Sequence, residues 1–162
     1  MDALPSLQGC DILLVQEHKL TGQPLDDFIQ RLWRLGWKAF ASPAGQGPLG
    51  GASAGALIAT KRHLDVFGRS IVTAHRCTRL LLRTRRLGTL AVYSIYFRPG
   101  EGLSPANRAV LSDIAADMSR HHAPTLLGGD FNLAVPDLSQ APLQKLRLTL
   151  AAPEAFTFAQ GN

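Results

Sequence analysis

The chain has 162 residues, of which 46% are hydrophobic and 18% are charged. This length and composition are typical of one globular domain, and they exclude a disordered tail or a scaffold that depends on disulfides. Cys10 and Cys77 form no C-x-x-C pair and no cluster with histidine, which argues against a structural zinc site. We expect a soluble, intracellular protein, because the sequence shows no signal-peptide pattern and no apolar run that could span a bilayer.

The net charge of +5 is unevenly distributed along the chain. Between Lys61 and Gly100, nine basic residues stand against one acid, Asp65, which leaves a local balance of +8. Such a concentration favours a polyanionic partner. Arginines that only keep the solvent side of strands soluble would explain the pattern equally well.

Strand and helix periodicities alternate in the first half of the chain. The aliphatic run Ile12–Val15 predicts a buried strand whose carboxyl end carries Glu17. An amphipathic helix is predicted next, with Pro24 in its first turn and Gly36 at its end. The Gly-, Ala- and Pro-rich segment 42–55 is expected to be a long loop. Further strands are predicted at 37–41, 54–60, 66–67 and 71–73.

The second half predicts a hairpin and a second helix. Residues 78–85 and 89–97 are expected to pair around a turn at Gly88. Ser104-Pro105 has the chemistry of a helix N-cap followed by the first helical position, and the apolar stripe continues to about His121. The remaining predicted elements are a strand at 125–127, a helix at 139–150 and a strand that begins at 156.

Gly45 to Gly50 spells G-x-G-x-x-G, the dinucleotide-binding fingerprint. Pro48 interrupts this motif, and a strand-like segment follows where the fingerprint requires a helix. We therefore reject a dinucleotide site.

Acidic and amide side chains follow two of the predicted buried strands. Glu17 ends one strand, and Asp130 and Asn132 end another, where an extended backbone points both to the same side. The glycines at 128 and 129 allow close approach of another backbone or a ligand. Oxygen ligands of this kind suit Mg²⁺ or Mn²⁺. The alternative is that these carboxylates are unrelated, solvent-facing strand ends.

Several segments together carry a family resemblance. In chain order they are Asp11 to His18 with its Gln-Glu end, Gly55 to Ile58, Val92 to Pro99 with its Tyr-x-x-Pro end, Leu126 to Asn132 with Gly-Asp-Phe-Asn, and Phe156 to Phe158. This series resembles the endonuclease/exonuclease/phosphatase superfamily of Mg²⁺-dependent phosphodiesterases, which includes abasic-site and retrotransposon endonucleases. The resemblance implies an α/β fold, a four-layer α/β sandwich of two mixed β-sheets flanked by helices, of which residues 1–162 would form one partial domain.

The resemblance also implies roles for four residues. Glu17 would bind the metal, Mg²⁺ or Mn²⁺, and Asp130 would orient or deprotonate the attacking water. Asn132 and Tyr96 would donate hydrogen bonds to the scissile phosphate. Tyr93, three positions earlier on the same strand, would face the opposite side and take no part.

The sequence departs from the family pattern at both ends. Family members begin with an Asn-bearing strand and end with a Ser-Asp-His motif, and neither occurs in this sequence. We therefore expect a chain truncated at both ends. The pair His121-His122 is expected to lie at a helix C-terminus, where cations complement the dipole, and Trp33 and Trp37 are expected to be core residues.

The favoured function is divalent-metal-dependent phosphodiester hydrolysis on nucleic acid, DNA in preference to RNA, with no membrane partner. One alternative is a catalytically inactive truncated relative or retroelement remnant that at most binds nucleic acid. Another is a phosphatase of phosphoinositides or other phosphoesters. The sequence does not indicate an oligomeric state.

Overall fold

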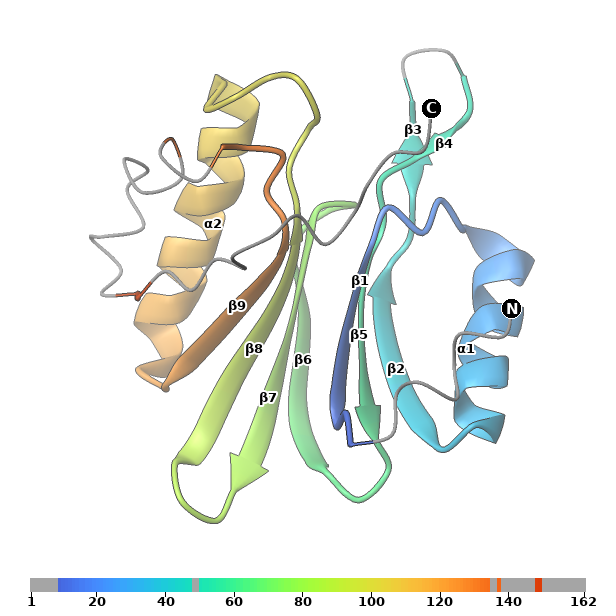
Figure 1. Cartoon of the computed structure of the whole chain (residues 1–162), viewed down its shortest axis with the longest axis vertical. Coiled ribbons are helices and arrows are strands. Elements are labelled where there is room, and N and C mark those ends of the chain that lie inside the picture. The colour runs from blue at the N-terminus through green and yellow to red at the C-terminus, as the bar shows by residue number, and fades with distance from the viewer. Residues whose placement is uncertain (1–8, 48–49, 135–136, 138–147, 150–162) are drawn as a thin grey trace.

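The computed structural model describes residues 9–47, 50–134, 137 and 148–149 (Figure 1). This part of the chain combines two helices with several β-sheets, so the α/β class predicted from the sequence is confirmed. The helices are α1 (Gly22–Arg34) and α2 (Pro105–His121). The strands are β1 (Ile12–Gln16), β2 (Trp37–Ser42), β3 (Gly45–Gln46), β4 (Ala52–Ser53), β5 (Ala56–Lys61), β6 (Asp65–Thr73), β7 (Cys77–Thr84), β8 (Gly88–Tyr96) and β9 (Thr125–Asp130).

The first sheet has three strands in the order β1-β5-β2. Both pairings are antiparallel, with Leu14 opposite Ile58 and Phe40 also opposite Ile58. Helix α1 covers the outer face of this sheet, where Leu32 packs with Trp37 and Leu57 in a buried cluster. Successive side chains of β5 therefore pack into two different apolar layers, one on each face of the sheet.

The second sheet has four strands in the order β6-β7-β8-β9. Strands β6, β7 and β8 are antiparallel, whereas β9 runs parallel to β8 and is reached through α2. Helix α2 covers the outer face of this sheet, where Val110, Leu111 and Ile114 pack against Tyr93 and Ile95. The prediction of two mixed sheets is thus met only by this sheet, because the three-stranded sheet is antiparallel throughout its described pairings.

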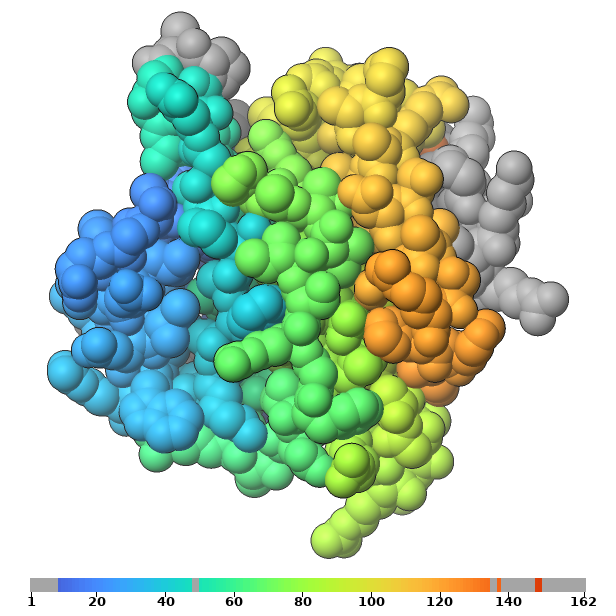
Figure 2. All heavy atoms as spheres, turned by 180° about the vertical axis from the view of Figure 1, so that it is seen from behind, coloured from blue at the N-terminus to red at the C-terminus, as the bar shows by residue number. Residues whose placement is uncertain are grey.

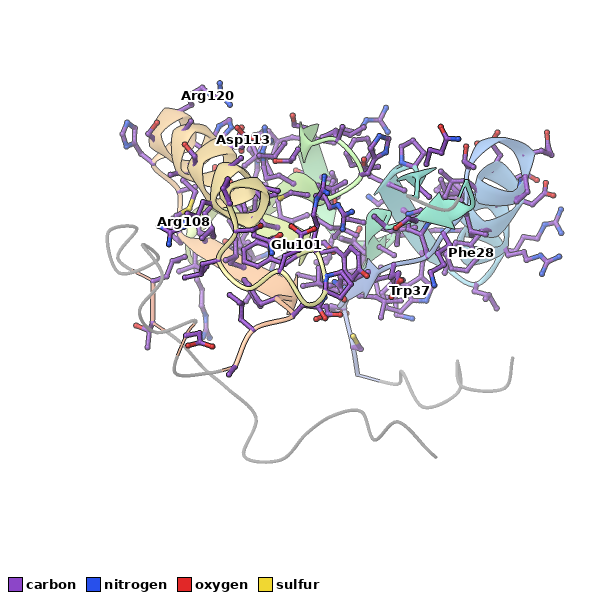
Figure 3. The ribbon with its side chains drawn as sticks, turned by 90° about the horizontal axis from the view of Figure 1, so that it is seen from above. Phe28, Trp37, Glu101, Arg108, Asp113 and Arg120 are labelled. Atoms are coloured by element: carbon purple, nitrogen blue, oxygen red, sulfur yellow. The ribbon has the colours of Figure 1, made fainter. Side chains whose placement is uncertain are left out.

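The inner faces of the two sheets pack against each other. Ile58 of the first sheet contacts a cluster formed by Leu80, Leu82 and Val92 of the second, and Leu14 packs at its margin. Viewed from above, α1 with Phe28 lies on one side of the strands and α2 lies on the other (Figure 3). The order of layers is helix, sheet, sheet, helix.

Most predicted elements are present, with some changes in extent. Ser104 caps α2 through a 3.2 Å hydrogen bond from the Asn107 backbone N–H, as its position predicts. The two short strands predicted at 66–67 and 71–73 form one continuous strand with register shifts. The predicted loop 42–55 contains the small antiparallel β3-β4 pair, which includes the start of the G-x-G-x-x-G motif. The strand predicted from 156, and the helix at 139–150 apart from residues 148 and 149, lie outside the described residues.

A buried polar network fastens α2 to the second sheet. Asp117 accepts hydrogen bonds from Tyr93 Oη at 2.8 Å and from Arg79 Nε at 3.0 Å, and Arg120 contacts its other oxygen at 2.9 Å. Burial opposes ionisation of Asp117, but these hydrogen bonds outweigh it and lower its pKa. His121 lies 3.7 Å from the same carboxylate in the last turn of α2, so the predicted helix-end position of His121 is confirmed.

No described helix is both long enough and apolar enough to cross a membrane.

Candidate active site

Strand β1 delivers Glu17 to the end of the first sheet that lies beside β8. The last residue of β1, Gln16, donates a 2.9 Å hydrogen bond from its side chain to Ser94 Oγ of β8 and so ties the two sheets together. Glu17 follows with a φ of +52°, a left-handed conformation that is uncommon for glutamate. Such backbone strain is retained where a side chain must be aimed in a particular direction. Glu17 is exposed at this point.

Tyr96 and Asp130 come together through the parallel pairing of β8 and β9, in which they are direct partners. Because side chains alternate along strands, both lie on the inner side of the sheet, whereas Tyr93 is buried on the opposite side under α2. The expectation that Tyr93 takes no part in the site agrees with this placement. Tyr96 is buried and Asp130 is exposed.

Burial, together with nearby carboxylates, keeps the Tyr96 hydroxyl protonated. Burial raises the pKa of Tyr96 to about 12, and the nearby carboxylates of Glu17 and Asp130 contribute to the increase. At neutral pH the hydroxyl is therefore a hydrogen-bond donor that lies near two anionic groups. The structure brings Glu17, Tyr96 and Asp130 together, although they belong to three separate segments of the chain.

Asn132 is fixed just beyond β9. Its backbone N–H donates a 3.0 Å hydrogen bond to Asp130 Oδ1, and its side-chain Nδ2 donates one of 3.0 Å to the carbonyl of Phe97. Its φ of +47° is left-handed, which asparagine tolerates better than most residues. The amide keeps a second N–H for another acceptor.

Arg76 is a member of this site that motif matching does not single out. Its guanidinium carbon lies 5.1 Å from the centre of the Tyr96 ring, and its backbone carbonyl accepts a 2.8 Å hydrogen bond from the Tyr96 N–H. Burial lowers the pKa of Arg76, and the nearby charge of Arg98 adds to this effect. In the sequence, Arg76 is one of nine similar basic residues in the stretch 61–100. The contact with Tyr96 places it at this site.

The neighbouring histidines are held by the backbone. The His18 ring lies 3.1 Å from the carbonyl oxygen of Ser42 and accepts a 3.1 Å hydrogen bond from the Leu20 N–H. Burial lowers the pKa of His18, which favours the neutral ring. His75 Nδ1 lies 2.8 Å from the Pro43 carbonyl oxygen. These two rings serve the loop structure around the site.

The donor set fits a hydrated hard cation. Among the residues that the structure describes, no group of three or more His, Cys, Asp or Glu side chains could hold a metal ion. Mg²⁺ differs from zinc in needing only one or two carboxylates, because it retains water and binds substrate phosphate. Glu17 and Asp130 are two exposed carboxylates near Tyr96. Glu17 also forms an exposed ion pair of 3.1 Å with Lys19, which a cation would displace.

A cavity of about 330 Å³ lies elsewhere, where the edge strands β2 and β6 meet, on the side of the molecule seen in Figure 2. Phe40, Val66 and Leu80 line it together with Lys38 and Arg69. Glu17, Tyr96, Asp130 and Asn132 are not among its lining residues. We therefore place the candidate chemistry at the ends of β1, β8 and β9, where the acidic and hydrogen-bonding groups gather.

The basic residues of the stretch 61–100 differ in exposure. Arg79 is buried in its ion pair with Asp117, so this arginine of the stretch is not available to a polyanionic partner. Arg83 is exposed but lies 3.6 Å from Asp65. The prediction that Trp33 is a core residue is wrong, because 52% of it is exposed. Trp37 is buried, as predicted.

A sequence profile described as the Endonuclease/Exonuclease/phosphatase family matches residues 2–161. The chain belongs to this family. The resemblance carried by the Gln-Glu and Gly-Asp-Phe-Asn segments is thereby confirmed. No curated protein sequence matches the chain.

Solved structures share the fold of this family member. ANGEL2, a 2′,3′-cyclic phosphatase, aligns with a TM-score of 0.66 at 16% identity over 88% of this chain and 45% of its own. Humanized D. rerio TDP2 with 14 mutations aligns with a TM-score of 0.61 at 13% identity. This alignment covers 85% of this chain and 55% of the TDP2 chain. The endonuclease domain of TRAS1, a telomere-specific non-LTR retrotransposon, aligns with a TM-score of 0.53 at 23% identity. This alignment covers 82% of this chain and 52% of the TRAS1 chain. The chain thus spans about half the length of these structures.

Proposed function

We propose that this chain carries the site of a divalent-metal-dependent phosphodiesterase that acts on nucleic acid. The observation that supports it best is the gathering of Glu17, Tyr96 and Asp130 at one end of the two sheets. The helix-sheet-sheet-helix order also supports the four-layer sandwich as the architecture of the domain.

Each residue of the proposed site has a distinct task. Asp130 accepts a hydrogen bond from the attacking water and orients it, or removes its proton. Tyr96 donates a hydrogen bond from its hydroxyl to a phosphate oxygen, because its raised pKa keeps the hydroxyl protonated across the neutral range. Asn132 offers its remaining amide N–H to the same group. The short chain of bonds from Asn132 to Asp130 and Phe97 keeps these donors and acceptors in fixed relation.

Glu17 would hold the metal, with Asp130 available to bind one of its waters. When bound, Mg²⁺ or Mn²⁺ would neutralise charge on the phosphate and on the leaving oxygen. The exposed position of Glu17 leaves room for the water molecules that Mg²⁺ retains.

Two observations support a polynucleotide substrate. Arg76 and Arg98 lie close to each other at the site, where phosphate groups would need positive charge. The TRAS1 structure, which shares the fold, is an endonuclease domain. DNA is preferred to RNA on the family resemblance. A phosphoester phosphatase is the alternative substrate class, and the ANGEL2 structure, a cyclic phosphatase with the same fold, supports it.

The test compares wild-type chain with Glu17→Gln and Asp130→Asn on plasmid DNA, abasic-site duplex, single-stranded RNA and a phosphoinositide, with Mg²⁺ or Mn²⁺. We expect metal-dependent cleavage of DNA that falls by about 10²–10³ in each variant. Asp65→Asn is the matched control, because Asp65 is also exposed but lies in a distant ion pair. Equal cleavage by all four proteins would contradict the assignment. Hydrolysis of the phosphoinositide alone would favour the phosphatase.

A nucleic-acid-binding protein without hydrolysis is the second candidate. The ion pair between Glu17 and Lys19 favours it, because Lys19 occupies the carboxylate that the metal needs. This candidate predicts that Lys19→Ala increases metal binding, and that wild-type chain binds duplex DNA in a salt-sensitive manner without cutting it. Unchanged DNA binding between low and physiological salt, or no binding at low salt, would exclude it.

A further inference from the structure

Arg76 has an unused hydrogen-bond donor at the proposed site. Its Nη1 is buried, and no hydrogen-bond partner for it exists among the described residues. A buried polar group without a partner is costly and uncommon, so it requires a physical explanation. The guanidinium that carries this donor lies 5.1 Å from the centre of the Tyr96 ring, at the proposed site.

The acids near Arg76 are already engaged with other cations. Glu101, which lies in the loop before α2 (Figure 3), forms an ion pair of 3.7 Å with Arg98. Glu17 forms its ion pair with Lys19. Neither carboxylate lies within ion-pair distance of the Arg76 guanidinium in the described residues. The positive charge of Arg98 nearby further disfavours an unpaired Arg76.

The position of the guanidinium is fixed by its surroundings. The guanidinium lies over the face of the Tyr96 ring, and the Arg76 backbone is bonded to the turn at Thr73 and to Tyr96 itself. A planar guanidinium held in this way is prepared to bind an anion with little further loss of conformational freedom. Its geometry matches two oxygens of one phosphate group.

We propose that Arg76 is the substrate-binding residue that donates hydrogen bonds from its guanidinium to the non-bridging oxygens of the substrate phosphate. This inference rests on the proposed phosphodiesterase function. The ligand is then an anionic phosphate ester. The residue that neutralises part of its charge, Arg76, lies in the turn between β6 and β7. The competing explanation is that Arg76 only packs against Tyr96 to support the sheet.

The first experiment measures binding of inorganic phosphate by calorimetry, without metal. Wild-type chain and Arg83→Gln are expected to bind phosphate equally, because Arg83 is an exposed arginine of β7 that lies away from the site. Arg76→Gln is expected to bind at least tenfold more weakly, and Arg76→Lys to fall between, because it keeps the charge without the planar fork. Circular dichroism establishes that each variant is folded. Equal binding by Arg76→Lys and wild type, with Arg76→Gln unfolded, would overturn the proposal in favour of a packing role.

A second readout separates this inference from the proposed function. If the wild type hydrolyses DNA, Arg76→Gln should raise KM for the substrate more than it lowers kcat. If no variant hydrolyses any substrate while phosphate binding still requires Arg76, the phosphodiesterase fails and the anion site stands. Tight phosphate binding by folded Arg76→Gln, or no phosphate binding by wild type, would overturn the Arg76 proposal whatever the activity.

Discussion

Tyr96 and Asp130 lie directly opposite each other as the last residue pair of the parallel strands β8 and β9. The strands come from segments separated by α2, and their pairing places a phenol and a carboxylate on the same side of one sheet. A shift of one residue in this register would turn Asp130 to the other face. The relative position of the two side chains therefore depends on the contacts that fix the register of β9 against β8.

Gly129 is the residue that allows this close pairing. A Cβ atom at Gly129 would collide with the Ile95 carbonyl oxygen, which is backbone and cannot move aside cheaply. We expect Gly129→Ala to lower the free energy of unfolding by about 3 kcal/mol. Gly128→Ala is the matched control, because its Cβ would meet only the end of the Leu14 side chain, and its cost should be about 1 kcal/mol. Urea denaturation measures both, and equal losses would show that the Ile95 contact does not limit the pairing.

Both tyrosines should resist ionisation in the folded protein. Burial raises the pKa of Tyr96 to about 12 and raises that of Tyr93 well above its usual range. The chain has two tyrosines, so its phenolate absorbance should stay flat near pH 10, where free tyrosine titrates. The unfolded chain releases these protons near pH 10, so folding stability should fall as the pH rises from there towards 12. A phenolate signal near pH 10 from folded protein would contradict this.

Breaking the buried ion pair between Arg79 and Asp117 should destabilise the fold strongly. Removing one partner leaves an uncompensated buried charge, so Asp117→Asn should lower the free energy of unfolding by about 3–5 kcal/mol at pH 7. Asp65→Asn, which breaks an ion pair between largely exposed residues, should cost less than about 1 kcal/mol. Chemical denaturation of the two variants provides the comparison. Similar costs for the two variants would show that an unpaired Arg79 is not penalised by its burial.

The effect of Asp117 should depend on pH in the acid range. Its pKa is lowered in the folded state, so its stabilisation is complete above the unfolded value of about 3.9 and is lost as the pH falls through the folded pKa. The difference in stability between wild type and Asp117→Asn should therefore be constant from about pH 5 to 7 and should shrink below about pH 4. A difference that grows on acidification would contradict the assigned direction.

The two thiols should differ in reactivity. Cys77 is fully buried, and burial raises the pKa of its thiol above the usual range, so little thiolate forms. Cys10 is partly exposed. A thiol reagent should modify one cysteine rapidly in folded protein and the second only after unfolding, and Cys10→Ser should abolish the rapid phase. Rapid modification of Cys77 in the folded Cys10→Ser variant would show that the β7 core opens.

Local sequence patterns were sufficient to predict the elements that carry the candidate site. The apolar run before Glu17 and the short run before Asp130 each indicate a strand with a polar end, and Ser104 marks the start of α2. These signals depend on neighbouring residues alone, because side-chain alternation and helix capping are local properties. The family resemblance added the roles of these residues.

Only the tertiary structure decided which basic residues are buried, which are exposed and which lie at the candidate site. Arg79 and Arg83 project from the same side of β7, four residues apart, and have the same chemistry in the sequence. Helix α2 covers Arg79 and supplies Asp117, but it leaves Arg83 exposed. Arg76 differs from both because the β6-β7 turn brings it over Tyr96. Alternation predicts which face a side chain lies on, whereas the element that covers this face is set by contacts between distant segments.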